Sequence, residues 1–163
     1  MRRPVIGIMG AAAPTSGSYA AAEKLGRLVA ERRWIVLTGG QPAGVMAAAC
    51  AGAKQVAGSL TLGILPGTSE GASPDVDVAV FTGMGDARNV INVLSSDIIV
   101  ACGVEGPGTT SEVALAIKAG KPVILLGASP AAQAFFGSIG GWLAAADPEE
   151  AVRLIEQRLE DTS

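Results

Sequence analysis

Glycine, hydroxyl and carboxylate residues are concentrated in one short stretch in the middle of the chain, residues 102–112. It reads Cys-Gly-Val-Glu-Gly-Pro-Gly-Thr-Thr-Ser-Glu, after a continuous apolar run at residues 98–100 and before further apolar residues. Glycines let a ligand approach the main chain, hydroxyl groups donate hydrogen bonds to anionic oxygens, and a helix N-terminus offers unpaired N–H groups with partial positive charge. We therefore interpret the stretch as a phosphate-binding loop between a buried strand and a helix. The residues predicted to contact the phosphate are Gly106, Gly108, Thr109, Thr110 and Ser111.

A second glycine-rich turn follows another apolar run, residues 34–38. Gly39 and Gly40 end that run, and an alanine-rich segment of helix-forming composition continues to about Val56. The glycines could serve only a tight turn between a strand and a helix. In combination with the first loop, they favour a role as the other half of the anion site. The residues assigned to this half are Thr38, Gly39, Gly40 and Gly44.

Two charged residues, Arg88 and Glu112, could act on a ligand at these loops. Arg88 falls in the first turn of a predicted helix over residues 87–96, where a cation opposes the helix dipole by about 0.3–1 kcal/mol. It should therefore have an anionic partner, which could be the ligand, Glu112 or a carboxylate such as Asp86. Thr109 and Glu112 have the spacing of a capping box, so Glu112 could either cap the helix or face the ligand.

The composition limits the class of protein. With 163 residues, 49% of them hydrophobic and 17% charged, the chain is too apolar for disorder and long enough to form a single domain over residues 1–163. Its apolar runs are too short to span a bilayer, so we expect a cytoplasmic protein that buries apolar surface in a homo-oligomer. The net charge of −3 offers no basic stripe for nucleic acid. Without histidine, and with Cys50 and Cys102 expected to be buried and not at metal-binding spacing, no metal site or histidine base is predicted.

Apolar runs of strand length alternate with segments of helical character along the chain. Strands are predicted at residues 5–9, 34–38, 60–65, 76–81, 98–102 and 123–126, with the fourth less buried than the others. Helices are predicted from a Ser18 cap to about Arg32, up to about Val56, at 87–96, from the phosphate-binding loop to Gly120, at 131–136, and from an Asp147 cap onward. This alternation predicts an α/β fold, a Rossmann-like three-layer sandwich with a mostly parallel sheet and helices on both faces. In such a fold, both glycine loops and residues 83–88 meet beyond the carboxyl ends of the strands.

Several of these motifs, in this order, resemble one superfamily. The segments concerned are Thr38-Gly-Gly, Gly63-Ile-Leu-Pro66, Arg88-Asn89, Gly106-Pro-Gly-Thr109 with Glu112, and Gly120-Lys-Pro-Val123. Together they look like the Rossmann-like superfamily of the lonely-guy or lysine decarboxylase-like phosphoribohydrolases. The Gly-Pro-Gly-Thr-x-x-Glu form and the helix around Arg88 are more similar to the branch that contains the molybdenum cofactor carrier proteins.

The resemblance implies one of two functions. The hydrolases cleave the N-glycosidic bond of nucleoside 5′-monophosphates, and the residues matching Arg88 and Glu112 would be catalytic at the ribose. The carrier proteins form tetramers and hold the molybdenum cofactor, a pterin that ends in a phosphate, as cargo. Val104 and Glu105 stand where the hydrolase motif has Pro and Gly, and Glu105 puts a carboxylate beside the expected phosphate. We therefore predict a carrier that binds and protects a phosphate-bearing pterin, the molybdenum cofactor, and keep a nucleoside 5′-monophosphate phosphoribohydrolase as the alternative.

Overall fold

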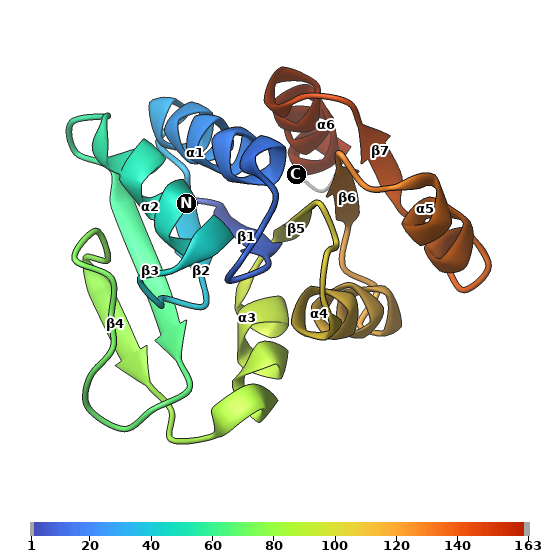
Figure 1. The fold of residues 1–163 in the computed structure, drawn as a ribbon. Helices are drawn as coiled ribbons and strands as arrows, with labels where there is room; N and C mark the ends of the chain where they lie inside the picture. The colour runs from blue at the N-terminus through green and yellow to red at the C-terminus, as the bar shows by residue number, and fades with distance from the viewer. Residues whose placement is uncertain (1, 162–163) are drawn as a thin grey trace.

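The computed structural model describes residues 2–161, and within them the strands form one parallel sheet (Figure 1). The sheet has seven strands in the order β4-β3-β2-β1-β5-β6-β7, and each neighbouring pair is parallel. The strands are β1 (Val5–Gly10), β2 (Ile35–Thr38), β3 (Leu60–Leu65), β4 (Val78–Phe81), β5 (Ile98–Cys102), β6 (Val123–Leu126) and β7 (Leu143–Ala145).

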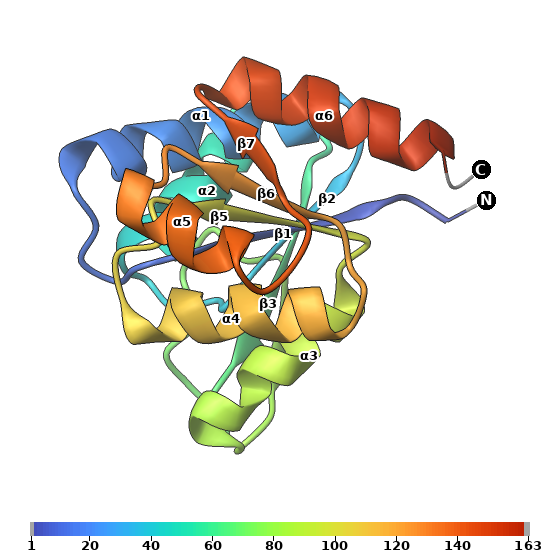
Figure 2. The same cartoon turned by 90° about the vertical axis from the view of Figure 1, so that its right-hand side faces the viewer.

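Helices cover both faces of this sheet (Figures 1 and 2). They are α1 (Ser16–Glu31), α2 (Gly44–Lys54), α3 (Asn89–Ser95), α4 (Pro107–Lys118), α5 (Pro130–Gly137) and α6 (Pro148–Asp161), and a 3₁₀ turn η1 (Gly85–Arg88) precedes α3. α1, α2 and α6 lie on one face, and α3 and α4 lie on the other. The predicted Rossmann-like three-layer α/β sandwich is therefore confirmed. Among residues 2–161, no helix has both the length and the apolar character needed to cross a bilayer.

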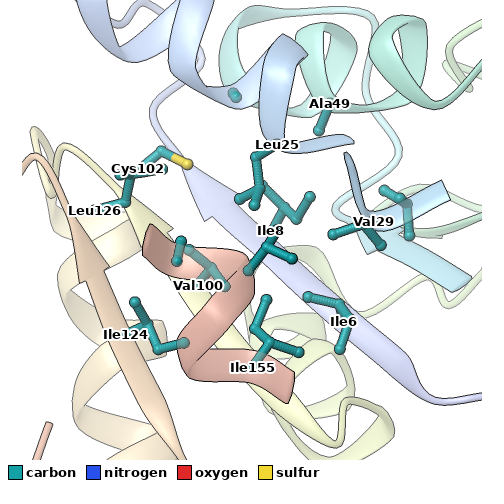
Figure 3. Close-up of a cluster of buried hydrophobic side chains, with 14 of the residues drawn as sticks. Ile6, Ile8, Leu25, Val29, Ala49, Val100, Cys102, Ile124, Leu126 and Ile155 are labelled. Atoms are coloured by element: carbon teal, nitrogen blue, oxygen red, sulfur yellow. The ribbon is translucent and has the colours of Figure 1, made fainter. Parts of the chain in front are cut away.

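The core lies on both sides of the central strands, as the alternation of side chains along a strand requires. In β5, Ile98, Val100 and Cys102 pack under α1 and α6, whereas Ile99 and Ala101 pack on the α4 side. Figure 3 shows Val100 and Cys102 in the first of these clusters. All five residues are buried, which explains why β5 reads as a continuous apolar run in the sequence. Each large aliphatic side chain buried in this way contributes about 1.5–3 kcal/mol, so the core fixes the strands whose ends carry the site.

The predicted helix starts are wrong at two places that matter for the site. Ser18 does not cap α1; the helix begins at Ser16 and Thr15 caps it, because the Thr15 side chain accepts a hydrogen bond from Ser18 N at 3.2 Å. The predicted helix at residues 87–96 is divided, so that Arg88 ends the η1 turn and only then does α3 begin. Two consecutive glycine-containing turns, with Gly83 and Gly85 both at positive φ, delay the α-helix.

Two strand predictions also needed correction. β4 begins at Val78, two residues later than predicted, because Asp77 instead accepts hydrogen bonds from the Thr61 main chain and hydroxyl group. All four β4 residues are exposed, which confirms the prediction of a less buried strand. β7 was missed altogether, since a three-residue strand after the glycine-rich residues 137–141 is too short to show a period.

The strand order changes direction between β1 and β5. From β1 the chain adds β2, β3 and β4 on one side, and then returns to add β5, β6 and β7 on the other. The loops that follow β1 and β5 therefore diverge, which opens a crevice at the carboxyl edge of the sheet. This is the position at which doubly wound α/β proteins bind their ligands.

Candidate functional site

A cleft of about 360 Å³ opens at the carboxyl ends of β1 and β5. The loop after β1 (residues 10–13) forms one wall, and the loop after β5 with the first turn of α4 (residues 105–109) forms another. The other residues that line the cleft are Ile8, Met9, Gly39, Met46, Asp86, Arg88, Asn89 and Glu112. Three loops predicted from the sequence meet here, and the loop after β1 is a fourth that the sequence analysis missed.

The N-terminus of α4 presents main-chain N–H groups to this cleft. Gly106 is the N-cap, no side chain caps the helix, and Pro107 occupies the first turn. Thr110 N bonds to Gly106 O at 3.1 Å, so the N–H groups of Gly108 and Thr109 precede the first intrahelical bond. Such a helix end, lined by two glycines, carries the partial positive charge and the open main chain that an anionic oxygen requires.

The capping box considered for Thr109 and Glu112 is wrong. Thr109 lies inside the helix rather than at its cap, and the Glu112 carboxylate accepts a side-chain hydrogen bond instead of reaching back to a main-chain N–H. Both side chains are buried, with 2% and 6% of their surface exposed. The alternative in which Glu112 faces the cleft matches its position in the lining.

Two of the predicted phosphate contacts do not line the cleft. The Thr110 hydroxyl donates to Gly106 O at 2.9 Å, and the Ser111 hydroxyl donates to Gly108 O at 2.7 Å. Ser111 also accepts a hydrogen bond from Asn89 Nδ2 at 3.1 Å. Their hydroxyl groups therefore bind the first turn of α4 itself, and Gly106, Gly108 and Thr109 are the predicted contacts that line the cleft.

In the second glycine turn, only Gly39 of the four predicted residues lines the cleft. The buried Thr38 hydroxyl accepts a hydrogen bond from Gly40 N at 3.0 Å and so fixes the turn. Gly40 and Gly44 have positive φ, and a Cβ at Gly44 would collide with the carbonyl groups of the loop after β1. Thr38, Gly40 and Gly44 therefore do not line the cleft but fix the conformation of the loops that form its walls.

Arg88 lies against Gly39 and is buried, with 8% of its surface exposed. Its Nη2 donates to Gln41 Oε1 at 3.2 Å, whereas its Nε is buried and has no hydrogen-bond partner among the described residues. Burial lowers the pKa of Arg88, and attraction to Glu112 and Asp86 opposes that shift. Within residues 2–161 no carboxylate forms an ion pair with Arg88, so the proposed pair with Asp86 is absent there.

Glu112 has a partner that the sequence analysis did not assign to the site. Asn92, fully buried on α3, donates from Nδ2 to Glu112 Oε1 at 2.8 Å. Burial raises the pKa of Glu112, while the Asn92 hydrogen bond and the Arg88 charge act in the opposite direction. The signal in the sequence was the spacing of Arg88 and Asn92, which places them on one side of the helical segment.

Glu105 lies at the edge of the cleft, as predicted, but its carboxylate is already hydrogen bonded. It accepts from Thr15 N at 3.0 Å, from the Thr15 hydroxyl at 2.9 Å and from the Ser18 hydroxyl at 2.7 Å. Burial alone would raise the pKa of Glu105, but these three hydrogen bonds outweigh it and hold the pKa below its ordinary value. Gly103 and Val104, both at positive φ, turn the chain so that Glu105 reaches the N-terminus of α1. Glu105 therefore ties the loop after β5 to the loop after β1.

The two cysteines are buried, as predicted. Burial raises the pKa of Cys50 to about 11 and that of Cys102 to about 12. Both thiols therefore stay protonated at neutral pH, and neither is a nucleophile for the cleft.

The fold and the cleft define a doubly wound α/β protein with a cleft at the switch point of its sheet. The chain belongs to the SLOG cluster4 family, whose model matches residues 3–152. An uncharacterized protein of Archaeoglobus fulgidus is 40% identical over 126 residues, which cover 77% of this chain and 82% of that protein.

Two solved structures are similar over nearly the whole chain. The molybdenum cofactor binding protein of the phototrophic bacterium Rippkaea orientalis has a TM-score of 0.93 at 46% identity, over 98% of this chain and 99% of that one. The molybdenum cofactor carrier protein of Chlamydomonas reinhardtii has a TM-score of 0.90 at 48% identity, over 97% and 99%. These matches confirm the resemblance to the carrier branch of the lonely-guy superfamily.

Proposed function

We propose that this protein binds, carries and protects the molybdenum cofactor, with the phosphate of the pterin at the N-terminus of α4. One observation carries the proposal: an uncapped helix end and the buried Arg88, which has no ion-pair partner within residues 2–161, line one cleft. The similar structures named above, described as molybdenum cofactor binding and carrier proteins, support the choice of ligand. A cleft of about 360 Å³ is within the range of small-molecule sites.

Each lining residue has a distinct role in this proposal. The N–H groups of Gly108 and Thr109 donate to the phosphate, and Gly106 leaves room for it because a Cβ there would point into open space. Arg88 adds a full positive charge to the cleft, and Gly39 leaves room for the guanidinium because it has no side chain. The other predicted contacts support these from behind: Thr38, Gly40, Gly44, Thr110 and Ser111.

We also propose that the protein is a cytoplasmic homo-oligomer, with the tetramer of the carrier branch as the expected state. Apolar side chains are exposed on β4, where Val78 and Val80 have 48% and 40% of their surface exposed, and on α3, where Leu94 has 58%. A second copy of the chain would bury such patches. Multi-angle light scattering of the purified protein tests this: a monomer would contradict it.

The test of the ligand is equilibrium binding of purified protein to molybdenum cofactor and, in parallel, to AMP. We expect tighter binding of the molybdenum cofactor, and we expect Arg88→Ala to weaken it by about tenfold or more, since hydrogen bonds to charged groups contribute about 1.5–3 kcal/mol. Arg27→Ala is the matched control, because Arg27 pairs with Glu31 on the surface of α1. Equal affinity for AMP, or no binding, would remove the proposal.

The alternative is a phosphoribohydrolase, and the burial of Arg88 and Glu112 in the same cleft favours keeping it. In that reaction Glu112 would act at the ribose and Arg88 would orient it. Release of ribose 5-phosphate from a nucleoside monophosphate, abolished by Glu112→Gln, would establish the enzyme. The absence of turnover across a panel of nucleotides would eliminate it.

A further inference from the structure

Asn92 is an unusual residue for its position on α3. Its side chain is fully buried, and its Oδ1 has no hydrogen-bond partner in the part of the chain that the structure describes. Burial of an amide with one end unpaired costs stability that an apolar residue of similar size would avoid. The only side-chain hydrogen bond that Asn92 forms among residues 2–161 is the donation to Glu112 Oε1.

This hydrogen bond occupies one oxygen of Glu112, in a cleft that the Arg88 side chain also lines. Since Asn92 holds Oε1, rotation of the Glu112 carboxylate is restricted, and the other oxygen accepts no hydrogen bond within residues 2–161. The Arg88 guanidinium donates to Gln41 Oε1 from Nη2, and the side chains of Arg88 and Glu112 both line the cleft. Arg88 and Glu112 attract each other without forming an ion pair.

We propose that Asn92 is a positioning residue that holds the Glu112 carboxylate in place. The free oxygen of Glu112 and the Arg88 guanidinium then form a second polar subsite. This subsite fits a ligand ring that carries an N–H donor beside a C=O acceptor. The ring N–H donates to Glu112, and Arg88 donates to the ring carbonyl group. The pterin of the proposed cargo has such an edge, so the choice of ring rests on the proposed function. In this proposal the N-terminus of α4 binds the phosphate, and Arg88 and Glu112 bind the ring edge as a separate subsite.

The electrostatics of the cleft agree with this geometry. Burial raises the pKa of Glu112, and the Asn92 hydrogen bond and the charge of Arg88 lower it; Asp86 faces Arg88 in turn. Removal of the Asn92 donor should therefore raise the pKa of Glu112 further. Binding of the ring needs the Glu112 carboxylate as an acceptor, so ring binding should be lost as the pH falls through the pKa of Glu112. This loss should occur at a higher pH in Asn92→Ala than in the wild type.

The experiment compares two probes, molybdenum cofactor and inorganic phosphate, on matched variants. Asn92→Leu keeps the approximate size of the side chain but removes its donor, and should weaken binding of the molybdenum cofactor by about tenfold to a hundredfold while inorganic phosphate changes by less than about twofold. Asn92→Asp with Glu112→Gln exchanges the amide and the carboxylate and should keep most of the wild-type affinity, because the new amide can donate to Asp and still offer its oxygen to the ring. Gln55→Ala is the control, since it removes the same kind of amide-to-carboxylate bond, Gln55 Nε2 to Glu23 Oε1, outside the cleft.

Equal affinity of the wild type and Asn92→Leu for the molybdenum cofactor would overturn the proposal, as would a parallel loss of inorganic phosphate binding. Where Asn92→Leu does not fold, Asn92→Ala takes its place. The pKa of Glu112, measured by ¹³C NMR in the wild type and in Asn92→Ala, gives a readout that needs no cofactor, and an unchanged value also overturns the proposal. If the wild type does not bind the molybdenum cofactor at all, the proposed function fails, while the pKa still decides the role of Asn92.

Discussion

Replacement of Gly39 by alanine would displace Arg88 without touching Arg88 itself. A Cβ at Gly39 would lie 2.9 Å from Arg88 Cζ and 2.7 Å from Met46 Sδ, and it would collide with Arg88 Nη1. Carbon atoms make favourable contacts at about 3.5–4.0 Å, so the guanidinium must move by roughly 1 Å. Gly39 is not among the glycines with positive φ, and alanine can therefore adopt its main-chain conformation.

The size of the effect follows from what Arg88 loses. A shift of the guanidinium would break its hydrogen bond to Gln41, which is already long at 3.2 Å, and remove its contact with the bound ligand. A charge-assisted hydrogen bond contributes about 1.5–3 kcal/mol, which corresponds to roughly 10- to 150-fold in affinity. Overpacking should lower the free energy of unfolding by about 1–3 kcal/mol.

The assay is equilibrium binding of the molybdenum cofactor together with urea unfolding, for Gly39→Ala, Arg88→Ala and the double variant. If both changes act through the same guanidinium, the double variant should bind no more weakly than Arg88→Ala alone. Gly137→Ala adds the same methyl group where the nearest atoms are 4.0 Å away, and should leave affinity unchanged. Full affinity in Gly39→Ala, or losses that add in the double variant, would refute the reasoning.

Three further predictions concern charge. Glu112→Gln should gain stability relative to the wild type as the pH rises above about 4.5, because the raised pKa of Glu112 means that its ionisation destabilises the folded state. Urea unfolding from pH 4 to 8 measures this difference, and parallel pH profiles of the two proteins would contradict the prediction. Glu105→Gln should lower the free energy of unfolding by less than about 1 kcal/mol, since the Glu105 carboxylate is exposed, but it should increase amide hydrogen exchange at Thr15 and Ser18. Unchanged exchange would show that Glu105 does not hold the loop after β1. Burial alone would raise the pKa of Asp97, but hydrogen bonds from Arg2 and Val5 outweigh it and lower the pKa. Asp97→Asn should therefore be less stable than the wild type at pH 7 and approach the stability of the wild type as the pH falls below about 3.8. A difference in the free energy of unfolding that stays constant into acid would contradict this.

The sequence predicts the sheet and the place of the site because those depend on local patterns. Apolar runs followed by glycines mark β2 and β5, and the carboxyl ends of parallel strands necessarily meet at one edge. The loop after β1 has the same form, but its alanines carry no chemistry, so nothing marked residues 11–13 as a wall of the cleft.

Other features depend on packing between elements far apart in the sequence. The bond between Asn92 and Glu112 exists only because α3 packs against α4, and the sequence does not fix the rotation of either helix. Glu105 was expected to face the phosphate, yet its hydrogen bonds to Thr15 and Ser18 depend on where α1 starts. Thr110 was assigned to the ligand by residue type alone, although a threonine in a first turn can also bond its own helix.

The balance of charge in the cleft bears on the choice between a carrier and a hydrolase. A general base must be free to approach the proton it removes, and its pKa must lie near the working pH. Asn92 holds one oxygen of Glu112 and opposes the rise of its pKa, which makes Glu112 a better fixed acceptor and a poorer base. A cargo protein needs the first property, because it must recognise a ring without reacting with it. We therefore expect Asn92→Ala to lose selectivity for the molybdenum cofactor over AMP without gaining release of ribose 5-phosphate; a gain of hydrolysis would show that Asn92 restrains an enzyme.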